Sequence, residues 1–197
     1  MAFNVSSFRS AMALDGARPN LFEVQIPGLA NYWGENTNGD FKFFCRAASI
    51  PGSTIGVVTV PYFGREVKLA GNRTFADWTV TVINDESFAY RSVFEEWMST
   101  INLHEENYRF DNAGYALADS AVVNQLSKVG SEDVPFIQRQ YEFKNLFPID
   151  ISEITLDWGD NDSVEEFTVT FAYDYWTATT PTNANVANVG PDPVDIS

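Results

Sequence analysis

The sequence has little positive charge. Its 197 residues include 12 Lys and Arg against 27 Asp and Glu, so the formal net charge is 12 − 27 = −15 with the single histidine neutral. Proteins that grip nucleic acid neutralise its phosphates with clustered Lys and Arg. This charge balance therefore argues against a protein that grips DNA or RNA.

The sequence has one cysteine and no long apolar run. Cys45 alone cannot form an intrachain disulfide or a cysteine-based zinc site, so the fold suits a reducing compartment. The first residues lack a charged segment followed by a sustained apolar core, and no stretch approaches the ~18 apolar residues of a membrane-spanning helix. We expect a soluble protein with no membrane association and no obvious export signal.

Reactive motifs are also missing. His104-Glu105-Glu106 resembles the start of a zinc-protease motif, but Tyr108 stands where the second histidine is needed. The acids of the 157–162 turn do not have the spacing of a calcium-binding EF-hand loop. Phosphate-binding loops of the GxxxxGK type are absent, and adjacent carboxylates point apart in helix and strand alike. We expect no enzymatic activity, no cofactor and no metal site.

The sequence has enough apolar residues to form a hydrophobic core. Hydrophobic residues make up 45% of the chain and aromatic residues 15%, which predicts a folded domain rather than a disordered acidic chain. The acidity is uneven. Residues 1–100 carry 8 basic and 10 acidic side chains, whereas residues 101–197 carry 4 and 17, so the balances are −2 and −13.

Short segments of alternating polarity, separated by Gly, Pro and Asn turns, predict β-strands in most of the chain. The predicted strands are Phe22–Ile26, Phe41–Ala47, Thr54–Val60, Arg65–Ala70, Trp78–Ile83, Gln138–Lys144, Glu153–Trp158 and Glu165–Trp176. Residues 103–134 have weak patterns and are predicted to be mostly loop.

Helices are predicted in two places. Ser6–Leu14 fits a short helix, and a longer one has apolar residues at helical spacing: Tyr90, Val93, Phe94, Trp97 and Ile101. Many short strands and one amphipathic helix predict a mainly β fold, an antiparallel β-barrel or sandwich with one flanking α-helix.

Three predicted strands have one apolar face and one face of Thr and acidic residues. The acids on these faces include Glu153, Asp157, Glu166 and Asp174. An ordinary solvated sheet explains this pattern. A sheet that lines an acidic channel is the alternative.

Several blocks of sequence resemble the tail tube proteins of contractile-tailed, myovirus-type bacteriophages, and they follow in that family's order. These blocks are ARPNLFEVQI (Ala17–Ile26), FKFFCRAASIPG (Phe41–Gly52), AGNRTFADWTVTVINDE (Ala70–Glu86), EITLDWGDN (Glu153–Asn161) and FTVTFAYDYW (Phe167–Trp176). The GNRTFADWTVTVINDE run is the most specific of them.

The resemblance implies a structural subunit that self-assembles. Six subunits would form a ring whose inner strands close a β-barrel around a lumen, and stacked rings would form a hollow tube inside the contractile sheath. Such a tube belongs to the virion, is made in the host cytoplasm and conducts DNA without binding it specifically. The implied partners are further copies of the chain, the tail sheath protein, and the baseplate, tail terminator and tape measure proteins.

The resemblance also divides the chain and suggests sites. Residues 1–176 would form the tail tube domain, and 177–197 a flexible or surface-wrapped extension on the outside of the tube or against the sheath. The segment 28–40 looks longer than in the family and is a candidate ring-stacking loop, with Tyr32, Trp33, Asn38 and Gly39 as its contact residues. The candidate lumen acids are Glu153, Asp157, Glu166 and Asp174, since an acidic wall repels phosphates.

Three other hypotheses remain open. The chain could be a tube subunit of a related contractile injection or secretion apparatus that carries no DNA. It could be a carbohydrate-binding β-sandwich that uses Tyr32 and Trp33. It could also be a carboxylate-based hydrolase, which only the large number of acidic residues supports.

Overall fold

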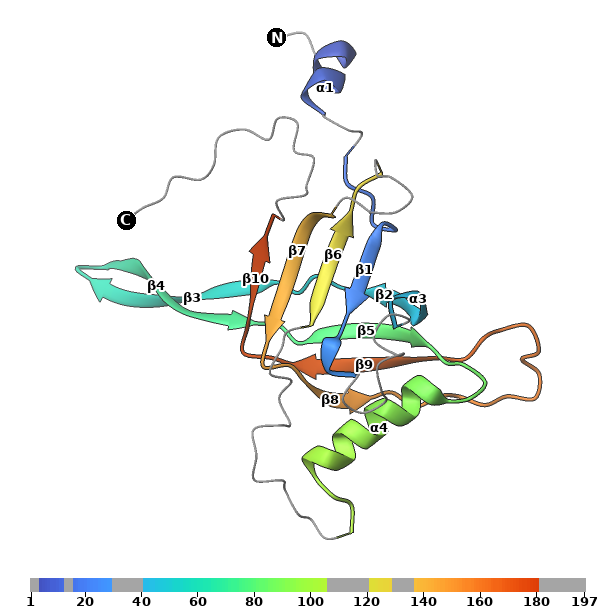
Figure 1. The fold of residues 1–197 in the computed structure, drawn as a ribbon. Helices are drawn as coiled ribbons and strands as arrows, with labels where there is room; N and C mark the ends of the chain where they lie inside the picture. The colour runs from blue at the N-terminus through green and yellow to red at the C-terminus, as the bar shows by residue number, and fades with distance from the viewer. Residues whose placement is uncertain (1–3, 13–15, 30–40, 106–120, 129–136, 181–197) are drawn as a thin grey trace.

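The computed structural model describes residues 4–12, 16–29, 41–105, 121–128 and 137–180 (Figure 1). The helical elements are α1 (Val5–Ala11), η2 (Pro27–Leu29), α3 (Phe41–Phe44) and α4 (Ala89–Ile101). The strands are β1 (Phe22–Gln25), β2 (Cys45–Ala48), β3 (Ser53–Tyr62), β4 (Arg65–Phe75), β5 (Trp78–Ile83), β6 (Val122–Leu126), β7 (Ile137–Lys144), β8 (Phe147–Ile151), β9 (Glu166–Ala172) and β10 (Tyr175–Thr179).

The strands form two four-stranded antiparallel sheets and one separate hairpin. Sheet A has the order β1-β6-β7-β10, and sheet B has the order β2-β5-β9-β8. Figure 1 shows the strands of sheet A crossing those of sheet B at a steep angle. Among the described strands, β3 and β4 pair only with each other. The fold is therefore mainly β and antiparallel, as predicted, and the sheets that these strands form do not close into a barrel.

The core lies on one face of sheet B. In β5 and β9, apolar residues stand directly opposite each other in the register Trp78↔Phe171, Val80↔Val169 and Val82↔Phe167. All six are at most 1% exposed. Trp78 stacks on Phe143 of sheet A with ring centroids 4.5 Å apart, so the two sheets share one aromatic core.

Helix α4 covers the rest of this apolar face. The Phe94 ring packs edge-on against the rings of Phe167 and Phe171 at centroid distances of 6.2 and 5.9 Å. Four residues of the predicted apolar stripe of α4, Tyr90, Val93, Phe94 and Trp97, are buried. The flanking amphipathic helix is thus confirmed.

The predicted strand Phe41–Ala47 was wrong in part. Phe41–Phe44 is a helical turn, and only Cys45–Ala48 continues as a strand. Phe41 and Phe44 both contact Tyr90 of α4, with ring centroids 5.9 and 4.4 Å apart. A helical turn puts residues three apart on one side, so this tertiary contact outweighs the local strand pattern.

The predicted strand Glu153–Trp158 was also wrong, because these residues form no ladder. Leu156 and Trp158 are 79% and 101% exposed, so these apolar residues pack on no strand or core in the part of the chain that the structure describes. Strands β6 and β8 were missed by the sequence patterns. Pro148 interrupts the pattern of β8, but an edge strand tolerates a proline.

The predicted strand Glu165–Trp176 is two strands. Its first part, β9, belongs to sheet B and its second part, β10, belongs to sheet A. The chain passes from one sheet to the other at Tyr173–Asp174, where the backbone N–H of Asp174 donates to the Lys144 carbonyl at 3.0 Å. Strand β10 runs on to Thr179, past the predicted domain end at residue 176.

Candidate assembly surfaces

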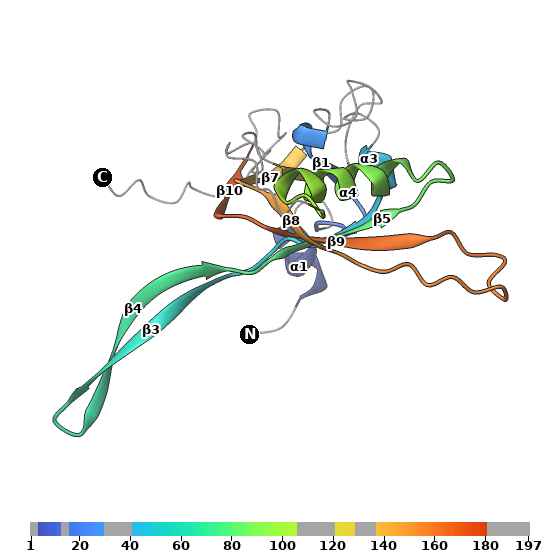
Figure 2. The same ribbon diagram turned by 90° about the horizontal axis from the view of Figure 1, so that it is seen from below.

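The outer face of sheet B is open and rich in threonine. On this face Thr79 pairs with Thr170, and Thr81 pairs with Thr168. Figure 2 shows α4 on one side of sheet B; helix α1 is drawn on the other side of β9 and β5, but Figure 1 shows that it lies away from sheet B, near the N-terminus. The alternation of Thr and apolar residues thus separates a solvated face from the core face, as the pattern predicts.

Charge is sparse within the strands of sheet B. Their only basic residue is Arg46, which forms a two-point ion pair with the Glu166 carboxylate. Arg46 and Glu166 are 60% and 29% exposed, so solvent screens this pair. The four strands present no unpaired cation on the open face.

The structure separates the four candidate lumen acids. Glu166 lies on β9, Glu153 and Asp157 lie in the segment 152–165 between β8 and β9, and Asp174 lies at the bend between β9 and β10. The Asp174 carboxylate accepts a hydrogen bond from Asn145 Nδ2. The predicted contact residues Tyr32, Trp33, Asn38 and Gly39 lie outside the described residues.

The β3–β4 hairpin projects from the body with both of its faces in solvent (Figures 1 and 2). Apart from Gly71 and Phe75, all of its strand residues are exposed. Its exposed large apolar residues are Ile55, Val57, Val58, Val60, Tyr62, Phe63, Val67 and Leu69. Contiguous exposed apolar surface of this kind marks a protein interface.

The two faces of the hairpin differ in chemistry. The register Val58↔Leu69 and Val60↔Val67 places four aliphatic side chains together on one face. The opposite face mixes polar and apolar residues, with Thr59 opposite Lys68 and Ile55 opposite Arg73. One face thus suits apolar packing, and the other suits contacts that involve charge.

A bulge with two glycines bends the hairpin near its base. The register shifts between Ile55 and Val57, where Gly56 faces Gly71. A Cβ atom on Gly71 would stand 3.0 Å from the Gly56 carbonyl oxygen, which is too close for an unshifted backbone. The glycines therefore allow the two backbones to approach, and they set the direction in which the hairpin leaves the body.

Aromatic rings anchor the base of the hairpin. Phe75 contacts Tyr173 and Trp176 at centroid distances of 6.2 Å each. The Tyr173 hydroxyl donates to the Ala76 carbonyl. Burial, with the nearby negative charge of Asp77, raises the pKa of Tyr173, so this hydroxyl keeps its proton. The hairpin is thus held at its base and free along its length.

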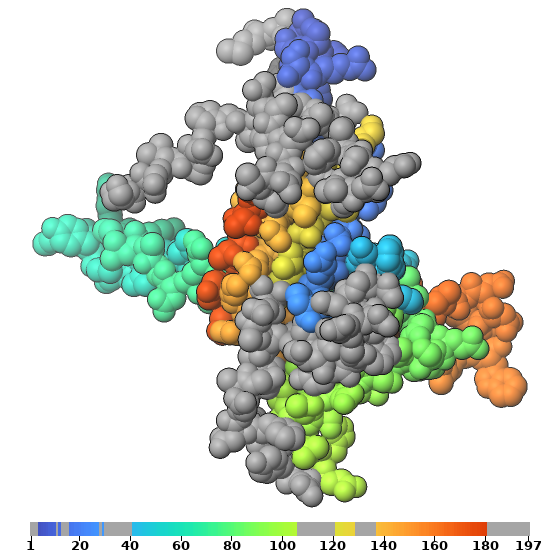
Figure 3. Space-filling model, viewed as in Figure 1, coloured from blue at the N-terminus to red at the C-terminus, as the bar shows by residue number. Residues whose placement is uncertain are grey.

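The segment 152–165 forms a second projection, which we call the acidic loop. It holds five acids and no basic residue: Glu153, Asp157, Asp160, Asp162 and Glu165. Its apolar residues Leu156, Trp158 and Val164 are 79%, 101% and 67% exposed. Figure 3 shows the loop, in orange, on the side of the molecule opposite the hairpin. A fully exposed tryptophan at a loop is typical of a surface that binds a partner.

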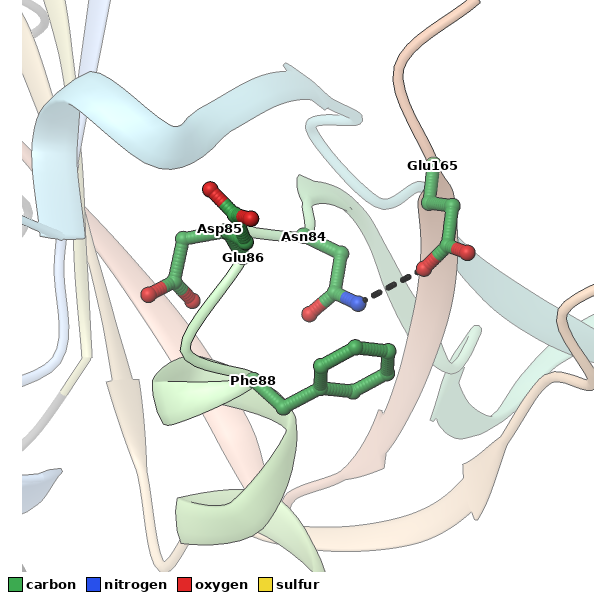
Figure 4. A pocket seen from close by; sticks show the side chains of 5 residues that line it. All are labelled: Asn84, Asp85, Glu86, Phe88 and Glu165. Carbon is green, nitrogen blue, oxygen red and sulfur yellow. Dashed lines mark hydrogen bonds between the residues drawn. The ribbon is translucent and has the colours of Figure 1, made fainter. Parts of the chain in front are cut away.

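A notch lies where the acidic loop meets β5 and α4. It is an open cavity of about 240 Å³ lined by Asn84, Asp85, Glu86, Phe88 and Glu165 (Figure 4). Asn84 is 6% exposed, and its Nδ2 donates to Glu165 Oε2 at 2.9 Å. Its backbone N–H donates to the Glu165 carbonyl, also at 2.9 Å. The buried Oδ1 of Asn84 has no hydrogen-bond partner among the described residues.

Asp85 connects the notch to the start of α4. Its Oδ1 accepts from the Ala89 backbone N–H at 3.0 Å, and its Oδ2 accepts from the Ser87 hydroxyl. Desolvation on its own raises the pKa of the Asp85 carboxyl, but these hydrogen bonds outweigh it and the pKa lies below its ordinary value. Asp85 thus stays ionised and satisfies the first backbone N–H of α4, that of Ala89.

The described residues contain no group of three or more His, Cys, Asp or Glu side chains arranged to hold a metal ion. His104 is exposed, and burial raises the pKa of the Cys45 thiol to about 12, which suppresses its thiolate. Among the described residues, no helix combines the length and apolarity that a membrane span needs.

Known proteins match nearly the whole chain. The family model described as phage tail tube protein matches residues 17–179. The chain is 37% identical over 162 residues to the tail tube protein gp19 of Enterobacteria phage T4, a match that covers 82% of this chain and 91% of that protein. The chain belongs to the phage tail tube protein family. The tail tube protein of Serratia phage KSP90 is 25% identical over 171 residues, which cover 86% of this chain and 93% of that protein.

Solved structures outside the phage relatives share the fold of this tail tube family member. A chain in the sheath–tube complex of the extracellular contractile injection system PVC superimposes with a TM-score of 0.57 at 14% identity, over 91% of this chain and 100% of that one. A chain in the tube-terminating cap of the anti-feeding prophage also gives 0.57 at 14% identity, over 84% and 92%.

Sequence patterns missed two surfaces of this tail tube protein. The strands of the hairpin were predicted, but not their exposure along both faces; the run Val57–Val58 in β3 breaks the alternation of a strand with one buried face. The notch has no local signature, because it joins residues 84–88 to Glu165, which lies about 80 positions further along the chain.

Proposed function

We propose that this chain is the structural, non-enzymatic subunit of a phage tail tube. Its family membership over residues 17–179 carries this proposal, together with 37% identity to the T4 tail tube protein over 82% of the chain. A tube subunit needs at least two different surfaces for its neighbours. The exposed apolar hairpin and the acidic loop supply such surfaces on opposite sides of the body.

The subunits assemble into six-membered rings that stack into a hollow tube. Contacts between two different surfaces are head-to-tail, and such contacts generate closed rings or helical filaments. The edge strands β2 and β8 of sheet B are available for pairing with neighbouring subunits. Ring closure would satisfy these edges, which otherwise favour aggregation.

The open face of sheet B lines the lumen in this proposal. Its Thr pairs are polar and uncharged, and its only basic strand residue, Arg46, is paired with Glu166. DNA phosphates would therefore meet no free cation on these strands. Six subunits carry 6 × −15 = −90 formal charges, and this field opposes DNA binding to the wall. Glu153, Asp157 and Asp174 remain candidate lumen acids beside Glu166.

The remaining surfaces serve contacts along and around the tube. The segment 28–40, with Tyr32, Trp33, Asn38 and Gly39, is the proposed ring-stacking loop. Residues 177–197 form the proposed outer extension toward the sheath. The partners are the tail sheath, baseplate, tail terminator and tape measure proteins, and the tube resides in the virion after synthesis in the host cytoplasm.

Negative-stain electron microscopy across a concentration series tests the assembly. We expect rings, or hollow tubes with sixfold end views, either spontaneously or after addition of baseplate nuclei. A protein that stays monomeric at all concentrations and with nuclei would refute the proposed function.

Selective labelling tests the lumen assignment. Cys45 is buried with a raised thiol pKa, so a cysteine introduced elsewhere is the preferred target for a maleimide–gold cluster. Thr79→Cys lies on the open face of sheet B and should place gold inside the tube. Glu96→Cys lies on the exposed side of α4, across sheet B, and is the matched control that should label the outside. Gold outside the tube for Thr79→Cys would contradict the assignment.

A tube subunit of a contractile injection apparatus without DNA is the second candidate. The similarity in fold to the PVC sheath–tube complex favours it, with a TM-score of 0.57. The identity of the genes adjacent to this one separates the candidates. Capsid and packaging genes support the phage tail, and their replacement by toxin or effector genes supports the injection apparatus.

A further inference from the structure

The hairpin and the notch carry opposite charge in a strongly acidic chain. Residues 53–75 of the hairpin contain Arg65, Lys68 and Arg73 against Glu66, so their balance is 3 − 1 = +2. The acidic loop has a balance of 0 − 5 = −5, and Asp85 and Glu86 of the notch add two more negative charges. The hairpin therefore has a net positive charge, whereas the acidic loop and the notch have a net negative charge.

The basic side chains of the hairpin have no partner within the described part of their own subunit. Neither an ion pair nor a side-chain hydrogen bond of Arg65, Lys68 or Arg73 occurs among the described residues. Lys68 and Arg73 share the mixed face of the hairpin, whereas Arg65 lies near its tip on the aliphatic face. Each can reach another molecule, because the hairpin projects into solvent.

No cationic side chain lines the notch among the residues that the structure describes. Three carboxylates, from Asp85, Glu86 and Glu165, surround it, and one wall is the Phe88 ring. In Figure 4 the Asn84 carbonyl oxygen points between Asp85 and Phe88, away from Glu165. This oxygen is buried and unpartnered, which is costly unless a donor arrives from another molecule.

The chemistry of the notch fits a basic side chain better than a metal ion. The described acids include no group of three that could hold a metal. A guanidinium or ammonium group can donate to Asn84 Oδ1, pair with the carboxylates and lie against the Phe88 ring. We propose that the notch of one subunit receives a basic side chain from the β3–β4 hairpin of a second copy of this chain.

The geometry agrees with a head-to-tail contact. The hairpin and the notch lie on opposite sides of the body, so a subunit that inserts its hairpin into one neighbour still offers its notch to another. The proposal rests on the proposed self-assembly into a tube. It names the residues that make one of the contacts between subunits. It also predicts that assembly weakens as the salt concentration rises, because salt screens these charges.

Charge reversal with rescue tests the contact in full-length protein. Glu86→Lys changes an exposed residue of the notch that does not cap α4, and it should raise the critical concentration for nucleated tube growth about tenfold. Arg65→Glu, Lys68→Glu and Arg73→Glu are each made alone and combined with Glu86→Lys. The hairpin residue that enters the notch is the one whose reversal restores growth in the double variant.

Controls separate this contact from general charge effects and from misfolding. Glu96→Lys and Arg18→Glu reverse exposed charges away from both surfaces and should change the critical concentration less than twofold. Far-UV circular dichroism checks that each variant is folded. The inference is wrong if Glu86→Lys behaves like Glu96→Lys, or if none of the three double variants recovers. Failure of the unaltered chain to form tubes would instead refute the proposed function itself.

Discussion

Two pairs of antiparallel strands both contain apolar residues, but these residues have opposite surroundings. In β5 and β9 the apolar residues Trp78, Val80 and Phe171 are 0% exposed, whereas Val58 and Leu69 in β3 and β4 are 51% and 53% exposed. Sheet A and α4 cover the first pair, and the body covers neither face of the second. A two-stranded sheet on its own excludes little water. The hairpin therefore presents aliphatic residues on one face without a second layer from the described part of its own subunit.

The largest loss of stability in the isolated subunit should come from a substitution in the core of β5 and β9. Trp78→Ala removes a fully buried ring that stacks on Phe143 and donates from Nε1 to the Ser49 carbonyl at 2.8 Å. We expect the free energy of unfolding of the monomer to fall by about 4 kcal/mol. Urea unfolding followed by circular dichroism measures it. A loss under about 1 kcal/mol would mean that the two sheets do not share this core.

A matched pair of valines tests the comparison directly. Val80→Ala removes two methyl groups from the core and should lower the free energy of unfolding by about 2 kcal/mol. Val58→Ala makes the same change on the hairpin and should alter it by less than about 0.5 kcal/mol. If the hairpin packs on another subunit in the tube, Val58→Ala should weaken the tube although it leaves the monomer stable. Equal losses in the monomer would show that the hairpin packs on its own body.

A smaller loss of stability is expected from a substitution of Asp85 at the start of helix α4. Asp85→Ala removes the acceptor of the Ala89 N–H and should lower the free energy of unfolding by about 1 kcal/mol at neutral pH. Asp85→Asn keeps an acceptor and should lose less. Because the folded state lowers the pKa of Asp85, its charge stabilises the fold above about pH 4. This stabilisation disappears as the pH falls through the lowered pKa.

The pH dependence of the unfolding free energy tests the role of the Asp85 carboxylate. We expect the difference in unfolding free energy between the unaltered chain and Asp85→Asn to be largest near neutral pH and to vanish under acid conditions. A difference that grows as the pH falls would mean that the protonated carboxyl, not the carboxylate, stabilises α4.

Sequence patterns correctly predicted the helix and strand that bury one face in the core. The stripe of α4 and the alternation of Trp78–Ile83 identified a helix and a strand that the structure confirms, because burial on one side selects residues with the period of the element. The predicted strand Glu153–Trp158 had the same alternation and is not a strand. Its exposed Leu156 and Trp158 face no strand among the described residues, and the pairing of a strand cannot be deduced from one segment.

The candidate surfaces were predictable only in part for the same reason. The Thr-rich face of β5 and β9 follows from the period of two in each strand. The notch requires the turn after β5 to meet the residue before β9, which depends on the order of the strands in sheet B. Sequence periodicity carries no information about strand order. The charge of the hairpin is visible in the sequence, but its isolation from the body is a property of the tertiary structure.

The smallest effect on the monomer, and the sharpest contrast with Trp78, should come from Trp158. This side chain is 101% exposed in the acidic loop, so Trp158→Ala should leave the free energy of unfolding of the monomer within about 0.5 kcal/mol of its original value. If the loop is an assembly surface, the same substitution should raise the critical concentration for tube growth roughly tenfold, since an aromatic anchor buried at an interface contributes more than its neighbours. Sedimentation of seeded tubes measures this concentration, with Glu96→Ala on the outer side of α4 as the control. Unchanged growth would mean that Trp158 is not an assembly contact, because its removal would then affect neither the fold nor the tube.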